Sequence, residues 1–257
     1  MAIPKSSDFS ADPAFWHARF LRQAEWTREL RHHLYRKLEI NRRPRILDLG
    51  CGTGVITAEL AERTLSEVHA ADRDRSLVAF ARREHAKLPV RWWVAGAAAL
   101  PFADGAFDLV VTHYFWLWAA SPRDVLRECK RVLAPGGRLA ALCEPDYGGR
   151  RDEPAELAGL GDEFRNGLVS KGADPCVGPK LPGLFEQAGF RTESGSSEYP
   201  WDNERHREEF GSEWSMIETT IGISDALREL KAMEMGAIAA GRRRSVMPVH
   251  WCLGTRQ

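Results

Sequence analysis

The sequence predicts an α/β fold: a doubly wound, mostly parallel sheet with helices on both faces. Short apolar runs alternate with amphipathic segments of helical period along the first 145 residues. Repeated strand–helix units of this length place successive strands parallel, with the connecting helices packed on the two faces. The 257 residues are enough for one such domain with a modest addition and a packed core.

The most informative stretch is a strand, a glycine turn and a helix in immediate succession. The apolar run at 46–49 is long enough for a buried strand and too short for a helix. Gly50, Gly52 and Gly54 follow, and 55–61 has the pattern of a helix start. Glycines allow unusual backbone angles and close approach of a ligand, and the new helix points free N–H groups at it. The stretch therefore predicts a ligand cradle.

An acidic residue stands where a ribose would be held. Residues 67–71 form the next predicted strand, and Asp72 ends it, 22 residues after Gly50. A carboxylate about 20 residues past the glycines accepts hydrogen bonds from both ribose hydroxyls. The pair of signals predicts a cofactor that contains a nucleoside.

The remaining elements follow from apolar periodicity and turn residues. Ser121 and Pro122 predict a capped helix start, and Pro248 is left out of the last strand because proline cannot sit inside a central strand. No clear strand is predicted over 144–180. Strands are predicted at 45–49, 67–71, 90–94, 107–112, 138–143, 190–199 and 249–255, and helices at 54–63, 74–87, 121–133, 181–189, within 13–40 and over most of 202–241.

The glycine spacing separates two classes of nucleotide-binding protein. Dinucleotide enzymes carry G-x-G-x-x-G, whereas this chain has G-x-G-x-G, with Val55 where the third glycine would fall. Here the sequence resembles the class I (Rossmann-like) S-adenosylmethionine-dependent methyltransferases, in particular those that act on small molecules. The resemblance covers roughly residues 40–145 and rests on 47–54, on 99–111 and on the Pro-Gly-Gly turn within 131–139.

This resemblance implies a seven-stranded sheet whose last strand is antiparallel, with a helical cap built from insertions at about 146–180 and 202–241. Residues 1–40 would be a tail and helices that cover the site, 41–145 the cofactor-binding core, and 146–257 the rest of the sheet and the cap. The three parts together would form one domain.

The resemblance also implies the cofactor, S-adenosyl-L-methionine, which would leave as S-adenosyl-L-homocysteine. Asp72 would hold the ribose and Arg73 would flank the adenine. One departure is Gly96, which stands where the family often has an aspartate for the adenine amino group. The residues expected to bind the cofactor are Asp48, Gly50, Cys51, Gly52, Gly54, Asp72, Arg73, Ala97, Ala98, His113 and Tyr114.

Methyl transfer from a sulfonium is an in-line displacement, so catalysis is largely positioning and exclusion of water, and no metal is required. A base is needed only if the acceptor loses a proton. His113, at the end of the fourth predicted strand and with a near-neutral pKa, is the first candidate; the alternative is a wall or core residue. Asp146 and Tyr147 are the second candidates, and a solvated loop is the alternative for them.

Aromatic residues supply candidates for the acceptor site, because stacking or cation–π contact would hold an aromatic or cationic molecule. Core packing is the alternative for at least two of the tryptophans, and a surface position is the alternative for the histidine. The candidates are Trp116, Trp118, Trp201, Trp214 and His206, with Gln23, Trp26 and Arg31 as weaker ones on the N-terminal helices.

Composition excludes several classes. The 36 basic and 36 acidic residues balance, which argues against a protein that wraps nucleic acid. No apolar run approaches the ~20 residues of a membrane span, and the first residues lack a signal-peptide core. Five scattered cysteines suggest neither a zinc site nor disulfides, so a cytoplasmic protein is expected. The basic run 242–244 is expected to be a solvated helix end.

The function predicted is transfer of a methyl group to an O, N, S or C atom of a small metabolite. One alternative is a protein that binds the cofactor without ordinary transfer, as a regulatory subunit or a non-methylating catalyst. An RNA or protein methyltransferase is a further alternative, which the neutral charge disfavours. The sequence identifies neither the acceptor nor the oligomeric state.

Overall fold

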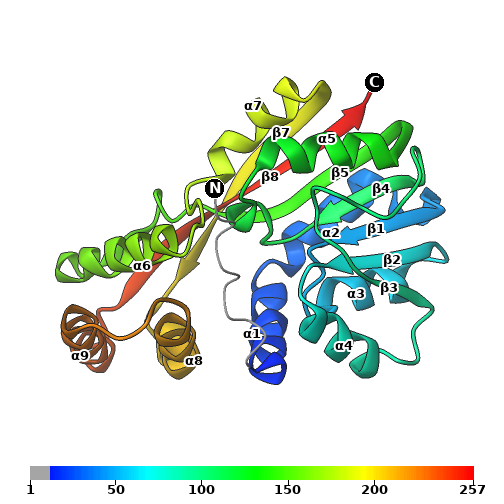
Figure 1. Ribbon diagram of the computed structural model, residues 1–257. Helices are drawn as coiled ribbons and strands as arrows, with labels where there is room; N and C mark the ends of the chain where they lie inside the picture. Colours follow the sequence, from blue (N-terminus) through cyan, green and yellow to red (C-terminus); the bar gives the residue numbers. More distant parts are fainter. Residues whose placement is uncertain (1–11) are drawn as a thin grey trace.

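The computed structural model describes residues 12–257, and its centre is a mixed sheet of eight strands (Figure 1). Five strands run parallel in the order β3-β2-β1-β4-β5, as the strand–helix alternation predicts. They are β1 (Arg45–Leu49), β2 (Glu67–Asp72), β3 (Val90–Val94), β4 (Phe107–Thr112) and β5 (Leu133–Pro145).

The C-terminal strand is antiparallel, as expected. β8 (Arg244–Arg256) pairs with β5 on one side and with β7 (Phe190–Trp201) on the other. A short eighth strand, β6 (Arg151–Glu153), pairs with the start of β8. The expected count of seven strands and the absence of a strand over 144–180 were therefore wrong. β6 contains only charged residues, so its sequence has no apolar alternation to reveal it.

Excluding Pro248 from the last strand was also wrong, because β8 runs through it. Pro248 lies opposite Glu198 of β7, and its carbonyl accepts a hydrogen bond from the Asp146 N–H at 2.9 Å. The nitrogen and carbonyl of one strand residue point to the same side, so the proline nitrogen faces β5 rather than β7. Since β5 ends at Pro145, no ladder bond is lost there.

The helices occupy the expected segments. At the start of α5, Pro122 is the first helical residue, but the Ser121 hydroxyl donates to Asp124 Oδ2 at 2.6 Å instead of capping the backbone. The helices are α1 (Pro13–Trp26), α2 (Arg28–Leu38), α3 (Val55–Arg63), α4 (Arg75–Glu84), α5 (Pro122–Val132), α6 (Ala158–Ser170), α7 (Leu181–Gln187), α8 (Asn203–Ile221) and α9 (Asp225–Ala239).

Alternate residues of the central strands point to opposite faces of the sheet, and each face carries its own core. Leu47 and Val110 pack on the side covered by α5 and α7, where Phe185 is fully buried. Ile46 and Leu109 pack on the other side, against α2 and α3. Both faces of the sheet are thus packed, so the loops at its strand ends are carried on a covered scaffold.

The cap predicted from the insertions is helical. α6, α8 and α9 pack against one another and extend beyond the sheet along β7 and β8, with α1 between them and the parallel strands (Figure 1). Trp16 of α1 belongs to the same apolar cluster as Phe164 of α6 and Trp214 of α8. The N-terminal helix therefore joins the cap to the sheet.

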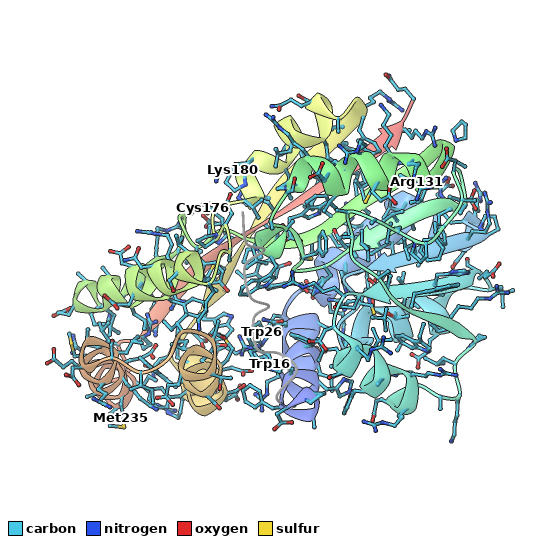
Figure 2. The ribbon with its side chains drawn as sticks, viewed as in Figure 1. Trp16, Trp26, Arg131, Cys176, Lys180 and Met235 are labelled. Carbon is cyan, nitrogen blue, oxygen red and sulfur yellow. The ribbon has the colours of Figure 1, made fainter. Side chains whose placement is uncertain are left out.

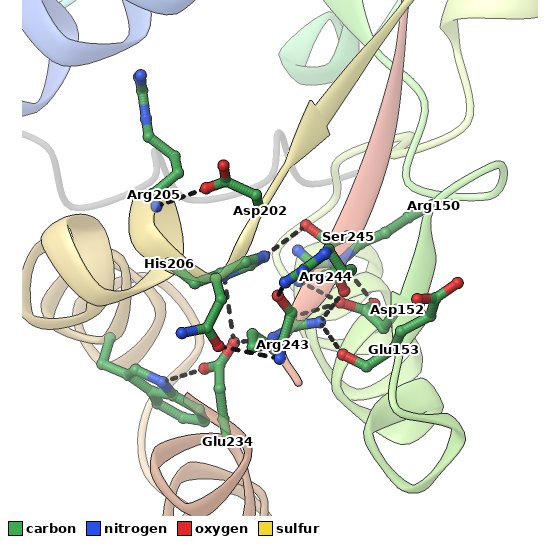
Figure 3. Close-up of polar contacts among 12 residues, drawn as sticks. Arg150, Asp152, Glu153, Asp202, Arg205, His206, Glu234, Arg243, Arg244 and Ser245 are labelled. Atoms are coloured by element: carbon green, nitrogen blue, oxygen red, sulfur yellow. Dashed lines mark hydrogen bonds and ion pairs between the residues drawn. The ribbon is translucent and has the colours of Figure 1, made fainter. Parts of the chain in front are cut away.

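Arg243 anchors the cap and is fully buried, so the expectation of a solvated run at 242–244 is wrong for this residue, whereas Arg242 and Arg244 are exposed as expected. Its Nε donates to Glu234 Oε1 at 2.7 Å, and its Nη2 donates to Asp152 Oδ1 at 2.6 Å (Figure 3). Its Nη1 donates to the Glu153 carbonyl at 3.1 Å. These bonds connect α9, β6 and the start of β8, and the two carboxylates neutralise the buried guanidinium.

Candidate functional site

Two adjoining cavities open where the parallel strands end, as the strand-end rule for α/β sheets predicts. The larger cavity has a volume of about 480 Å³ and is lined by residues that follow β1, β2, β3 and β4. The smaller cavity, of about 80 Å³, lies among α1, α6, α8 and the ends of β5, β7 and β8. Five residues line both and form what we call the junction: Gln23, Tyr114, Tyr147, Phe164 and Met216.

The three glycines of the cradle are required by its geometry. Gly50, Gly52 and Gly54 have φ angles of +76°, +52° and +84°, which side chains rarely adopt. A Cβ on Gly50 would overlap the ring of Phe115, and one on Gly54 would lie 2.7 Å from Trp92 Cη2. The backbone can therefore follow this path only with glycine.

Asp72 is held in a fixed orientation at the end of β2. Its Oδ2 accepts from the Gly52 N–H at 2.9 Å, and its Oδ1 accepts from the Asp74 N–H at 2.9 Å. Burial raises the pKa of Asp72, while these two N–H groups act to lower it. Each carboxylate oxygen keeps a second lone pair, so the side chain, which lines the larger cavity, can also accept from two hydroxyls.

Asp48 lies at the end of β1 and is buried beneath the cradle. The Thr57 hydroxyl donates to its Oδ2 at 2.5 Å, which ties the strand to α3. Burial raises the pKa of Asp48 from 3.8 to about 7, and the hydrogen bond from Thr57 opposes the shift. A carboxyl that titrates near neutral pH therefore lies below the glycine turn.

This shift predicts a pH-dependent stability. Between about pH 4 and pH 7 the folded Asp48 keeps a proton that the unfolded chain has lost, so the free energy of unfolding should fall as the pH rises through this window. One such group contributes a slope of at most about 1.4 kcal/mol per pH unit. In urea titrations across the window, Asp48→Asn should remove this component. Asp108, whose pKa is lowered by Arg45, contributes a slope of opposite sign only below about pH 4, so Asp108→Asn should leave the slope within the window unchanged. Equal slopes for Asp48→Asn and wild type would exclude Asp48 as the source.

The loop after β4 is held by Glu144, which is fully buried. Its Oε1 accepts from the Phe115 N–H at 2.8 Å and its Oε2 accepts from the Trp116 N–H at 3.1 Å. Burial raises the pKa of Glu144 to about 8. Tyr114 just before has φ +52°, a strained conformation for a residue other than glycine. The loop thereby places Phe115 against Gly50 and Tyr114 at the junction.

The structure brings together nearly all the residues predicted to bind the cofactor. Gly54 is the exception: it precedes α3 and packs near Trp92 without lining the larger cavity. Gly96 also lines this cavity and has open space beside it. The predicted residues in the cavity wall are Asp48, Gly50, Cys51, Gly52, Asp72, Arg73, Ala97, Ala98, His113 and Tyr114.

The three candidates for catalysis lie in different places. His113 lines the larger cavity, its Nε2 is 3.1 Å from Thr27 Oγ1, and burial keeps its pKa well below the usual value. Asp146 lines neither cavity and instead accepts from the Gly148 N–H at 2.9 Å within a turn. Tyr147 lies at the junction. Among the three, only Tyr147 faces both cavities.

The weaker candidate Arg31 lines neither cavity. It donates a hydrogen bond to Thr27 Oγ1 at 2.8 Å and so helps to hold Thr27, the residue that contacts His113, in place.

Two of the four candidate tryptophans belong to the core. Trp116 is fully buried and its Nε1 donates to Thr112 Oγ1 at 2.9 Å, whereas Trp214 lies inside the cap and donates to Glu234 Oε2 at 2.6 Å. Neither lines a cavity, which corrects their assignment to the acceptor site. Trp118 lines the larger cavity, and Trp201 lines the smaller one.

His206 also lines the smaller cavity and is buried rather than at the surface. Its Nε2 is 2.9 Å from Ser245 Oγ (Figure 3). Burial, and then the nearby Arg243, lower the pKa of His206 to about 3. The ring is therefore neutral at physiological pH.

The charged residues of the smaller cavity were missed by the sequence analysis. Arg19 and Arg150 are both in its wall, and so is Glu213. Arg19 shares a face of α1 with Gln23 and Trp26, at the helical spacings of four and seven, and that spacing was an available signal. Figure 2 shows Trp16 and Trp26 on the side of α1 toward the cap helices. The sequence around Arg150 contains no local pattern that predicts its place in the cavity wall, because that place depends on the path of the chain after β5.

Two other kinds of site are absent from residues 12–257. In this part of the chain no group of His, Cys, Asp and Glu side chains is placed to hold a metal ion. Within the same range, no helix has both the length and the apolar character needed to cross a bilayer.

Comparison with known proteins agrees with the fold and the motifs. Residues 47–141 match the family model described as a methyltransferase domain. The chain is 48% identical over 101 residues to demethylmenaquinone methyltransferase of Thermus thermophilus, which is 38% of this chain and 46% of that protein. It is 36% identical over 96 residues to malonyl-[acyl-carrier protein] O-methyltransferase of Hahella chejuensis, covering 37% and 34% of the two chains.

The fold itself extends over most of the chain. The YcgJ protein of Bacillus subtilis superposes with a TM-score of 0.62 at 18% identity, covering 90% of this chain and 99% of that one. The two curated relatives, by contrast, are matched over less than half of their own lengths. The matched segment, residues 47–141, is thus similar to a methyltransferase domain, and the strand order around it is that of the class I, Rossmann-like methyltransferase fold.

Proposed function

We propose that this protein transfers a methyl group from S-adenosylmethionine to an O, N, S or C atom of a small molecule. The observation that carries the proposal is the orientation of Asp72, whose two oxygens are fixed by the N–H groups of Gly52 and Asp74 beside three left-handed glycines. A carboxylate in this place fits a ribose diol, and the side-chain-free turn fits a ligand lying on the backbone. When bound, the cofactor would supply an electrophilic methyl group on a positively charged sulfur.

The larger cavity provides a place for each part of the cofactor. Gly50 and Gly52 would lie against its methionine and ribose portions, and Asp72 would accept from the ribose hydroxyls. Arg73 would flank the adenine, and Ala97 and Ala98 would line its edge. Because Gly96 replaces the acidic residue common in the family, adenine recognition would depend on backbone groups. His113 and Tyr114 would approach the methionine end.

The acceptor would enter the smaller cavity and present its attacking atom at the junction. Burial raises the pKa of Tyr147 to about 12, so its hydroxyl stays protonated at neutral pH and would orient the acceptor by hydrogen bonding. His113 is neutral and would be the candidate base if the acceptor must lose a proton, but because burial lowers its pKa it would be a weak base that suits only an acidic acceptor proton. Apolar walls from Phe164 and Met216 would exclude water.

The curated relatives act on different acceptors, so they do not identify the acceptor of this chain. The proposal keeps the cytoplasm as the compartment, because all five cysteines are free thiols, as is usual in reducing compartments.

The test is turnover with isotopically labelled S-adenosylmethionine and a panel of small acceptors, with product detected by mass spectrometry. With an active acceptor, Tyr147→Phe should lower kcat/KM about 10- to 100-fold through lost positioning while the affinity for S-adenosylhomocysteine stays unchanged. Tyr35→Phe, on α2 and outside both cavities, is the matched control. A Tyr147→Phe variant as active as this control would remove Tyr147 from the site.

A further inference from the structure

The smaller cavity contains charged side chains, yet each of them already has an oppositely charged partner. Four such residues line it: Arg19, Arg150, Glu213 and Glu234. The pairing of these four decides what kind of acceptor the cavity can take, because a buried ion needs a free counter-charge.

Arg19 is paired within the wall itself. It is 4% exposed and forms an ion pair with Glu213, so α1 and α8 are joined by opposite charges. Its guanidinium carbon also lies 4.5 Å from the centre of the Trp26 ring, a cation–π contact. The charge of Arg19 is therefore paired with a carboxylate and faces an aromatic ring, and its buried Nε–H, which has no hydrogen-bond partner, is left to donate to an uncharged oxygen.

The charges of Arg150 and Glu234 are paired with residues that do not line the cavity. Arg150 donates to both oxygens of Asp152, through Nε at 2.8 Å and Nη2 at 2.9 Å. Glu234 accepts from Arg243 Nε at 2.7 Å (Figure 3). Arg150 and Asp152 form a bidentate pair, and Arg243, the partner of Glu234, is fully buried. Neither pair therefore presents an excess charge to the cavity.

The rest of the wall is mostly apolar and aromatic. Trp26 and Trp201 meet edge to face, with ring centres 4.9 Å apart. Phe210, Met216 and Ile217 of α8 complete this side. A flat apolar body would be buried well here, whereas an ion would lose its hydration without gaining a partner.

We propose that the acceptor is an uncharged molecule with a flat, largely apolar body, which the smaller cavity selects because every charge in its wall is already paired. The role of this cavity as the acceptor site rests on the proposed function. Selection against ions follows from the pairing itself: an anion or a cation would have to break one of these ion pairs to enter.

Three probes that share one ring test the selection: benzyl alcohol, benzoate and benzylammonium. Binding to the protein saturated with S-adenosylhomocysteine is measured by calorimetry and by tryptophan fluorescence. The alcohol should bind at least about fivefold more tightly than either ion. An ion that binds as tightly as the alcohol, or no binding by the alcohol, would overturn the inference.

The preference should invert when one partner of a pair is neutralised. Glu213→Gln leaves Arg19 without its carboxylate, so benzoate affinity should rise at least about tenfold and exceed that of the alcohol. Glu218→Gln is the matched control, since Glu218 lies on the same helix, pairs with Lys231 at 2.6 Å and lines neither cavity. It should keep the wild-type order. An unchanged order in Glu213→Gln would contradict the role of the pairing.

Should Glu213→Gln fail to fold, Trp201→Ala provides an independent test. It should weaken benzyl alcohol binding at least about fivefold and leave the affinity for S-adenosylhomocysteine unchanged; unchanged alcohol affinity would count against the inference. Failure of S-adenosylhomocysteine to bind the wild-type chain would refute the proposed function. Normal binding of it together with a preference for an ionic probe would refute only the inference.

Discussion

Gly50→Ala should bind S-adenosylhomocysteine about 100-fold more weakly than the wild-type chain, a loss of about 2.7 kcal/mol. Two causes add at this position. The backbone has φ +76°, which alanine adopts only with strain, and the new Cβ would overlap Phe115. Since Glu144 holds the Phe115 backbone, the relief has to come from the ring turning toward the cavity or from movement of the glycine turn. Either change would alter the part of the cavity wall against which the cofactor would lie.

Gly136→Ala separates the strain from the overlap. Gly136 has almost the same φ, +75°, but a Cβ there meets no atom within 4 Å, and it lies outside both cavities. This variant should lose about 1 kcal/mol of stability and no affinity for S-adenosylhomocysteine. Thermal unfolding and calorimetric titration of both variants measure the two quantities. Wild-type affinity in Gly50→Ala would show that the turn is not where the cofactor binds.

Asp72→Ala should reduce the same affinity by about two to three orders of magnitude. It would remove two hydrogen bonds that the ribose hydroxyls donate to a charged acceptor, each with a contribution of about 1.5–3 kcal/mol, and the loss is expected near the lower end of their sum. It also leaves the Gly52 and Asp74 N–H groups without their acceptor, which loosens the turn. The affinity is read from titrations at a single pH, near 7.5.

Asp108→Ala is the control for this variant. Asp108 pairs with Arg45 at the opposite end of the parallel strands and lines neither cavity, so its removal should lower stability and leave cofactor affinity unchanged. Asp72→Ala behaving like Asp108→Ala would mean that the carboxylate at 72 has only a structural role.

Local sequence signals were sufficient to bring together most residues that line the larger cavity. The apolar run of β1, the glycines and Asp72 lie within one strand–helix–strand unit, so their spacing alone determines that they meet. The strand-end rule then adds His113 and Tyr114. These predictions depend on short segments whose conformation is set by their own residues, and the structure brings nearly all of them together in one cavity.

The smaller cavity could not be predicted in the same way, because its wall comes from segments far apart in the chain. Arg19 and Glu213 meet only once α8 has packed against α1. Trp116 and Trp118 are two residues apart, yet the short helical turn between them sends Trp116 into the core and leaves Trp118 at the larger cavity.

Arg243 shows the same limit of a local prediction. In sequence it belongs to a basic run that is typical of a solvated helix end. Its burial depends on Glu234 and Asp152, which no local pattern connects to it.

Calorimetric titration of the wild-type chain and of Asp72→Ala with S-adenosylhomocysteine tests the main conclusion most directly. We expect the wild-type chain to bind one molecule per chain with a Kd of about 10 μM or tighter, and the variant to bind about 100- to 1,000-fold more weakly under the same conditions. No heat with the wild-type chain, or equal affinity for the two proteins, would contradict a nucleoside cofactor held between the glycine turn and the carboxylate at the end of β2.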